Sequence, residues 1–299
     1  MLKISFSQMK TSRLPTFFLS HGGGPWPYTT GEIRRQFASL ESSLKEFRRQ
    51  VGIKPKAILV VSGHWEDKDF AVMANPRPPM VYDYGGFPET RHMRYAAPGS
   101  PELAQRVHSL IQQAGLPTHL DPVRGFDHGT YSLLAVTHPE AEIPVIQVSI
   151  RTDYDPESHL HLGRALAPLR DVGILIIGSG SSYHNFHPKN ARRESARFDA
   201  WLKETLVDAT PNQRSERLLN WNRAPFARAA QPEEDHLVPL FVAVGAAEEE
   251  PGKVIYREGN FFGMVTLSNY QFGLAGQDAE LSLLVEPGDR SQGTAIGWV

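Results

Sequence analysis

The sequence predicts an α/β fold: a single domain over residues 1–299, with a central mostly parallel or mixed sheet and helices on both faces. The first observation is that short apolar runs alternate with helical patterns, which is typical of this class. The second is that the runs at 57–61 (AILVV) and 173–177 (GILII) are continuously apolar, as in strands buried on both faces. The third is that no linker, internal repeat or low-complexity segment divides the chain.

The first half of the chain begins with a strand expected at 16–19 (TFFL). A long amphipathic helix is expected over 31–51, because six apolar residues recur at intervals of three and four. These residues are Ile33, Phe37, Leu40, Leu44, Phe47 and Val51. The strand at 57–61 comes next, and residues 71–99 are expected to form a loop because proline and glycine punctuate them.

The second half continues the alternation. Ser100 is suited to cap a helix with Pro101 at its first position, and Gly115 is suited to end it. Strands are expected at 144–150 (PVIQVSI) and 173–177, helices at 159–169, 191–207 and 236–247, and β-like segments at 254–274.

Composition excludes several classes of protein. With 40% hydrophobic and 21% charged residues, the chain can bury a sizeable core. A net charge of −2 gives no sign of a nucleic-acid or membrane-surface partner. The N-terminus lacks the pattern of a signal peptide, and no apolar run approaches the roughly 18 residues that span a bilayer, so we expect a cytoplasmic protein.

Cysteine is absent, which excludes disulfides, thiolate metal ligands and a cysteine nucleophile. Three apolar runs end in turns of small residues that each carry a histidine: TFFLS leads to His21, AILVVSG to His64 and GILIIGSGSSY to His184. If these strands are parallel, the three imidazoles meet at the carboxyl edge of the sheet, where α/β folds bind ligands. A metal site is therefore expected at this edge, and a histidine cluster suits Zn, Fe, Cu or Ni.

Two further histidines stand in suggestive contexts. His128 lies beside Asp127 in the glycine-bounded segment GFDHGTY, and His236 follows acidic residues at the start of an apolar helix (EEDHLVPLF). Taken singly, His128 is also compatible with an ordinary loop residue. The acids before His236 are also compatible with a structural role, in which they complement the positive end of the helix dipole.

Two other chemistries have weak signals. The segment GSGSS at 178–182 could bind an anion, but the full P-loop pattern is absent. The run HGGG at 21–24 matches the oxyanion element of esterases, yet the chain has no G-x-S-x-G nucleophile elbow.

Seven motifs occur in an order and spacing that resemble one family. They are FFLSHGGGPWPY, VVSGHWE, YDYGGFPETRHMRYAAPGSPELA, GFDHGTYSLL, PVIQVSI, GSGSSYHNF and EEDHLVPLFVAVGA. Together they resemble the DOPA-dioxygenase branch of the class III extradiol ring-cleaving dioxygenases, which are related to the β subunit of protocatechuate 4,5-dioxygenase. The resemblance covers about residues 15–275.

The resemblance implies one divalent metal ion per chain, with His21, His64 and His236 as ligands. It implies that His184 lies beside the metal, as a catalytic base or a further metal contact, and that His128 lines the substrate pocket. Better-known relatives use two histidines and a carboxylate, the triad favoured by Fe(II) oxygenases. The branch matched here has His236 where that carboxylate would be. Fe(II) is expected for activity, Zn(II) is also compatible with three histidines, and Glu234 or Asp235 could still supply a carboxylate.

The function implied is metal-dependent extradiol cleavage of a catechol, DOPA or a similar compound, by O₂ to a ring-opened semialdehyde. The partners implied are the small-molecule catechol and O₂, and a homo-oligomer is compatible with the sequence. Tyr131 and Trp65 could line the ring pocket, and Arg91 or Arg94 could pair with a substrate carboxylate. A zinc-dependent hydrolase and a non-enzymatic metal-binding member of the superfamily remain as alternatives.

Overall fold

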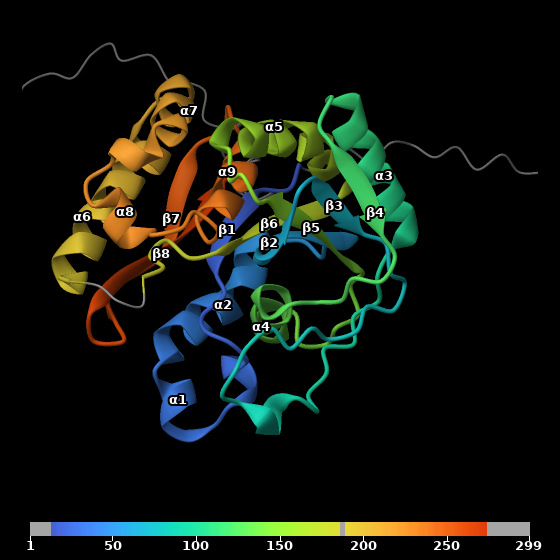
Figure 1. Ribbon diagram of the computed structural model, residues 1–299, viewed down its shortest axis with the longest axis horizontal. Helices are drawn as coiled ribbons and strands as arrows, with labels where there is room; N and C mark the ends of the chain where they lie inside the picture. Colours follow the sequence, from blue (N-terminus) through green and yellow to red (C-terminus); the bar gives the residue numbers. More distant parts are fainter. Residues whose placement is uncertain (1–12, 186–188, 274–299) are drawn as a thin grey trace, which may run out of the picture.

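A computed structural model describes residues 13–185 and 189–273, and one eight-stranded mixed sheet runs through their centre (Figure 1). Its strand order is β4-β3-β5-β2-β6-β1-β8-β7. In chain order the strands are β1 Thr16–Ser20, β2 Ala57–Asp67, β3 Phe70–Met73, β4 Thr118–Asp121, β5 Val145–Arg151, β6 Ile174–Gly180, β7 Gly252–Phe261 and β8 Val265–Phe272.

The centre of the sheet is parallel and its edges are mixed. Strands β5, β2, β6 and β1 are neighbours in that order, and each pair is parallel. The β7–β8 hairpin joins the β1 edge in antiparallel fashion, whereas β3 is antiparallel to β5 and parallel to β4. The apolar runs of β2 and β6 are fully buried because helices cover both faces of the central strands.

Helices pack on both faces of the sheet, with α5 and α9 on one side and α2 and α4 on the other (Figure 1). Helix α6 packs on β8. The α-helices of the described residues are α1 Gly31–Arg35, α2 Ala38–Val51, α3 Pro101–Gln113, α4 His128–Thr137, α5 Pro156–Leu166, α6 Ala191–Lys203, α7 Pro211–Leu219, α8 Ala227–Ala230 and α9 Val238–Gly245. Across the described residues, no helix combines the length and the apolar character needed to cross a bilayer.

The helix predicted over 31–51 is not continuous, although both of its ends are helical. The chain forms α1 and then α2, and Ile33 of the predicted apolar stripe is 43% exposed. The stripe is correct from Phe37 onward, where each of its members is buried. The break lies at Gln36 and Phe37, where Phe37 leaves helical geometry and packs on the ring of Trp26.

The predicted loop at 71–99 begins too early, because β3 occupies its first residues. The four-residue strand β4 and helix α7 were not predicted at all. The helix predicted at 159–169 starts earlier, with Pro156 at its first turn, and ends at Leu166. The helix predicted at 191–207 ends at Lys203, after which Glu204–Asp208 forms a π-helical turn.

Candidate metal centre and active site

Parallel strands bring the first two candidate histidines to one edge of the sheet. Strand β6 lies between β2 and β1, and all three run in the same direction. His21 directly follows β1, and its backbone N–H donates to the carbonyl of Gly180 at 3.3 Å. His64 lies within β2, which continues to Asp67, and not at its end as predicted. Between Ser62 and Glu66 the pairing of β2 with β5 shifts register, as is common beside functional sites.

His236 reaches the same edge from the segment before α9. This segment packs so closely on the sheet that a Cβ atom on Gly180 would lie 2.1 Å from the His236 carbonyl oxygen. A Cβ atom on Gly63 would lie 2.7 Å from the carbonyl oxygen of Asp235. Glycine at these two positions therefore allows the close approach that places His236 beside His64.

The three imidazoles form one cluster. The Nε2 atoms of His64 and His236 are 3.1 Å apart, and their ring centroids are 4.7 Å apart. The ring centroid of His21 lies 4.9 Å from that of His64 and 5.2 Å from that of His236. One potential ligand atom from each side chain lies within 4.8 Å of the other two.

The chemistry of this donor set fits a divalent cation. His21 is 2% exposed, yet neither of its ring nitrogens has a hydrogen-bond partner within residues 13–185 and 189–273. A buried polar group without a partner costs free energy, so these nitrogens indicate a ligand. The 3.1 Å between the Nε2 atoms of His64 and His236 also suits two ligands bound at about 2.1 Å, which lie about 3.0–3.4 Å apart.

The imidazoles of the cluster are held neutral, which is the form that binds metals. Burial lowers the pKa values of His21 and His64 well below the usual 6.5, and the neighbouring imidazoles lower them further. Burial also lowers the pKa of His236 to about 4, although its hydrogen bond to Asp235 acts in the opposite direction.

His184 and His128 each lie against a different ring of the cluster. The ring of His184 stacks on that of His236, with a centroid distance of 3.4 Å and an interplanar angle of 19°. The ring of His128 lies against that of His64, with centroids 3.8 Å apart, and 5.4 Å from that of His21. The structure thus brings together all five histidines that the sequence singled out. His128 is the first residue of α4 and not a turn residue.

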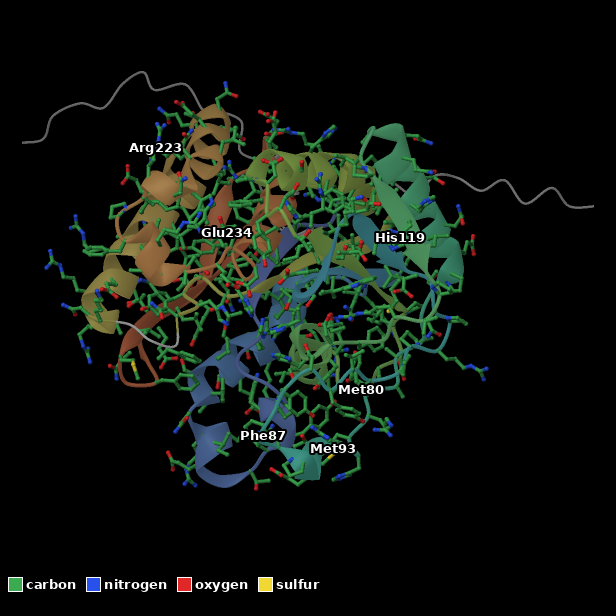
Figure 2. All side chains as sticks on the ribbon, viewed as in Figure 1. Met80, Phe87, Met93, His119, Arg223 and Glu234 are labelled. Atoms are coloured by element: carbon green, nitrogen blue, oxygen red, sulfur yellow. The ribbon has the colours of Figure 1, made fainter. Side chains whose placement is uncertain are left out.

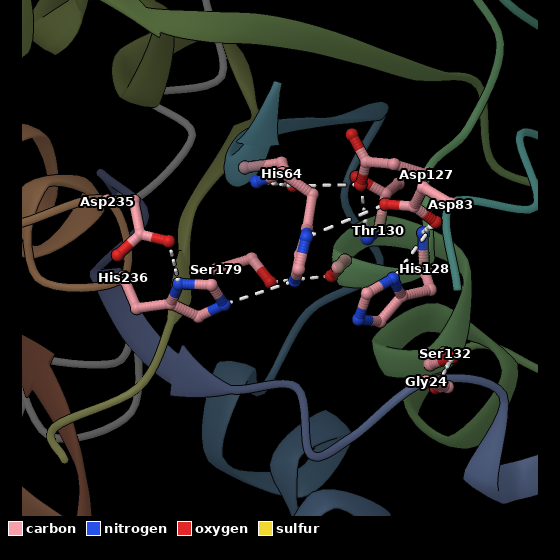
Figure 3. Close-up of polar contacts among 12 residues, drawn as sticks. Gly24, His64, Asp83, Asp127, His128, Thr130, Ser132, Ser179, Asp235 and His236 are labelled. Atoms are coloured by element: carbon pink, nitrogen blue, oxygen red, sulfur yellow. Dashed lines mark hydrogen bonds and ion pairs between the residues drawn. The ribbon is translucent and has the colours of Figure 1, made fainter. Parts of the chain in front are cut away.

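Two carboxylates contact the cluster (Figure 3). An oxygen of Asp235 lies 2.7 Å from His236 Nδ1, and its other oxygen lies 3.7 Å from His184 Nδ1. Burial by itself raises the pKa of Asp235, but the two histidines outweigh it and hold that pKa far below its usual range. Asp83 accepts from His128 Nδ1 at 2.9 Å and lies 3.5 Å from His64 Nδ1.

Asp127 is a third important carboxylate. It is fully buried and caps α4 by accepting from the Thr130 N–H, at 3.1 Å. It also accepts hydrogen bonds from Ser62 Oγ at 2.8 Å, Gln147 Nε2 at 2.7 Å and the Arg124 guanidinium at 2.9 Å. Asp127 therefore ties β2, β5 and α4 together next to His64 and His128.

Sequence reasoning gave no role to Asp83, and it named Asp127 only as the neighbour of His128. Asp127 directly before an apolar stretch is a helix N-cap signal that could have been found. Asp83 lies in the irregular segment between β3 and α3, far along the chain from both His64 and His128, so no local pattern indicates its contacts.

The residues predicted to line the ring pocket or to pair with a substrate carboxylate each have other contacts in the structure. Trp65 is buried beneath the Arg124 guanidinium, 4.8 Å from the ring centroid. Tyr131 is buried, and burial together with the nearby Tyr84 hydroxyl raises its pKa well above the usual value. Arg94 contacts the Tyr82 hydroxyl and the Met93 carbonyl.

The acidic residues before His236 differ in their partners. The carboxylate of Glu234 pairs with the Arg228 guanidinium at 2.6 Å, while Asp235 contacts the histidines.

Comparisons with known proteins give a consistent result. The family described as "Catalytic LigB subunit of aromatic ring-opening dioxygenase" matches residues 14–273. The 4,5-DOPA dioxygenase extradiol of Beta vulgaris is 36% identical over 268 residues, covering 86% of this chain and 96% of that protein. The protein of the same name from Portulaca grandiflora is 37% identical, covering 86% and 95%. The crystal structure of an uncharacterized protein from Escherichia coli K12 superposes with a TM-score of 0.69 at 30% identity, covering 87% of this chain and 100% of that one.

Proposed function

The chain belongs to the aromatic ring-opening dioxygenase family of the catalytic LigB subunit and cleaves catechol rings in the extradiol manner, and from this premise we propose that His21, His64 and His236 bind its metal ion. The observation that carries this proposal is that the two ring nitrogens of buried His21 have no hydrogen-bond partner among the described residues. One of them lies within 4.8 Å of a potential ligand atom of His64 and of His236, within reach of a single ion.

The metal expected for activity is Fe(II), although three histidines also bind Zn(II). When bound, the ion would supply Lewis-acid chemistry that brings catechol and O₂ together and stabilises anionic oxygen. The three neutral imidazoles of His21, His64 and His236 would hold it at the carboxyl edge of β1 and β2.

His184 is the proposed general base. Its Nδ1 faces Asp235, so Nε2 is the atom that accepts a proton from a catechol hydroxyl. Asp235 stabilises the imidazolium that forms, because an ionised carboxylate 3.7 Å away favours the positive charge. An imidazole suits this task because it titrates near neutral pH.

His128 is proposed to bind the substrate. Its Nδ1 is engaged by Asp83, so its Nε2 remains to hydrogen-bond substrate or dioxygen. The ring of Tyr84 stands at 86° to that of His128, with centroids 6.0 Å apart, which adds an aromatic wall on this side.

The substrate is proposed to be DOPA or a similar catechol. The support is that the relatives from Beta vulgaris and Portulaca grandiflora are both named 4,5-DOPA dioxygenase extradiol. Arg91 and Arg94, in the irregular segment that also contains Asp83, are the candidates for pairing with a substrate carboxylate.

Histidine variants separate metal binding from proton transfer. Replacing His21 or His64 with alanine is expected to abolish tight metal binding, measured by competition with a coloured chelator. His184→Ala is expected to keep the metal and lose turnover, assayed by O₂ uptake with DOPA. His119→Ala is the matched control, because His119 is 46% exposed on the edge strand β4 (Figure 2). Near-normal turnover of His184→Ala would contradict its role as base.

A further inference from the structure

The two carboxylates that contact the cluster occupy equivalent positions (Figure 3). Asp235 lies between His236, a proposed metal ligand, and His184, the proposed base. Asp83 lies between His64, another proposed ligand, and His128, the proposed substrate contact. Each carboxylate thus joins one metal ligand to one histidine that does not bind the metal.

The contacts fix which nitrogen of each ring faces inward. An ionised carboxylate accepts hydrogen bonds and cannot donate them, so His236 carries its proton on Nδ1 and has a lone pair on Nε2. Asp83 imposes the same arrangement on His128, at 2.9 Å, and favours it for His64 across 3.5 Å. His64 and His236 therefore direct Nε2 lone pairs at one another, 3.1 Å apart, which is favourable only with a cation between them.

Neither carboxylate can replace a histidine as ligand of the same ion. Both contact the Nδ1 edges of their rings, while the Nε2 edges of His64 and His236 face the centre of the cluster. Asp83 and Asp235 thus lie on the outer side of the imidazoles.

The charges support a shared role. Three neutral imidazoles leave a divalent ion with its full charge of +2, whereas a set with one carboxylate ligand reduces it to +1. Asp83 and Asp235 place two negative charges near the ion, each separated from it by one imidazole ring. The side chain of Asp235 is 15% exposed, and that of Asp83 is 20% exposed although the residue as a whole is exposed. Their charges are therefore only partly screened by water.

We propose that Asp83 and Asp235 are paired positioning residues, each of which orients one metal ligand and one non-ligating histidine and supplies negative charge that the ligand set lacks. This inference rests on the proposed function, because it takes His21, His64 and His236 as the ligands. Breaking either carboxylate contact then weakens metal binding and misorients one catalytic histidine at the same time.

The test compares Asp83→Asn and Asp235→Asn with two matched controls. Glu234→Gln neutralises the carboxylate next to Asp235, which pairs with Arg228 and not with a histidine. Glu89→Gln neutralises an exposed carboxylate in the segment that contains Asp83. All variants are made in the full chain, and thermal unfolding without metal checks that each one folds.

The readouts are the affinity for Co(II), the visible spectrum of the Co(II) protein and imidazole ¹⁵N shifts of the zinc-loaded protein. Loss of a partner of a ligating histidine typically weakens metal binding 10–100-fold. We expect about that loss for Asp235→Asn, and about tenfold for Asp83→Asn because its contact to His64 is longer. The Co(II) spectrum changes in both variants and in neither control.

Two outcomes would overturn the inference in different ways. If His21→Ala loses the metal while both aspartate variants bind Co(II) like the controls, with unchanged spectra, the positioning role is wrong and the metal site stands. If His21→Ala binds Co(II) as tightly as the unmodified chain, the proposed three-histidine site is wrong, and the positioning role fails with it.

Discussion

Gly180 offers a direct way to displace one proposed metal ligand without touching its side chain. In Gly180→Ala the new Cβ atom would stand 2.1 Å from the His236 carbonyl oxygen, whereas real Cβ atoms essentially never come closer than 3.0 Å. The obstacle is backbone at the carboxyl end of β6, so the His236 main chain must retreat by about 0.9 Å, the difference between those two distances.

Such a retreat is large beside a metal–nitrogen bond of about 2.1 Å. We expect the affinity for Zn(II) or Co(II) to fall at least about tenfold, because one of three ligands no longer reaches the ion. The free energy of unfolding should also fall by about 1–3 kcal/mol, which is typical of an overpacked core. Chelator competition measures the affinity, and urea unfolding of the metal-free protein measures the stability.

Gly245→Ala is the matched control. Its Cβ atom would stand 2.2 Å from the Leu160 carbonyl oxygen, an equal conflict, but at the far end of α9 from His236. This variant should lose similar stability and keep its metal affinity within about twofold. If Gly180→Ala binds metal as tightly as Gly245→Ala, His236 is not a ligand and the reasoning is refuted.

Three further predictions concern folding and metal removal. His159 is fully buried, donates from Nδ1 to the Asp155 carbonyl and accepts the Arg151 N–H at Nε2, and burial lowers its pKa to about 4. In the unfolded chain His159 protonates near pH 6.5, but in the folded chain it stays neutral until about pH 4, so the free energy of unfolding falls as the pH drops from 6.5 towards 4. Between pH 7.5 and pH 5 this fall should be about 2 kcal/mol smaller in His159→Gln than in the unmodified chain. An equal fall in the two proteins, measured by urea unfolding, would contradict this. Asp127→Ala should cost about 3–5 kcal/mol in urea unfolding, because it leaves the Arg124 charge and other buried donors without their acceptor, and a cost below about 1 kcal/mol would show that water replaces it. Metal at 100 times its Kd should raise the free energy of unfolding of the unmodified chain by about 2.7 kcal/mol, and a chelator should remove this gain. His21→Ala should show no gain with metal, and a gain in this variant would place the metal elsewhere.

Much of the fold follows from strong local patterns. The α/β class is confirmed, because continuous apolar runs such as 57–61 form the buried parallel centre of the sheet. The short strands β3 and β4 escaped prediction, since four residues give too little periodicity and their pairing is decided by distant partners. Ile33 matches the helical spacing of the apolar stripe in the sequence. The helix is interrupted between Ile33 and Ala38, however, so Ile33 faces solvent.

The candidate site was predictable to the extent that strand direction decides it. His21 and His64 meet because β1, β6 and β2 are parallel neighbours. The contacts of Asp83 could not be predicted, because the irregular segment between β3 and α3 approaches His128 only through tertiary folding. The resemblance to extradiol dioxygenases is confirmed by the family match over residues 14–273.

Other expectations stay predictions. They are the single domain over 1–299, the roles of the five histidines, the identity of the metal, a cytoplasmic location, the absence of nucleic-acid and membrane partners, and a homo-oligomer.

The central claim is that this chain opens catechol rings with O₂ at a metal held by three histidines. The most direct measurement is anaerobic loading of metal-free protein with Fe(II), followed by DOPA and a known amount of O₂. We predict equimolar consumption of O₂ and DOPA with a yellow ring-opened semialdehyde, and no turnover when Zn(II) replaces Fe(II). Ring opening without O₂ uptake, or unchanged turnover in His21→Ala loaded in the same way, would contradict the account.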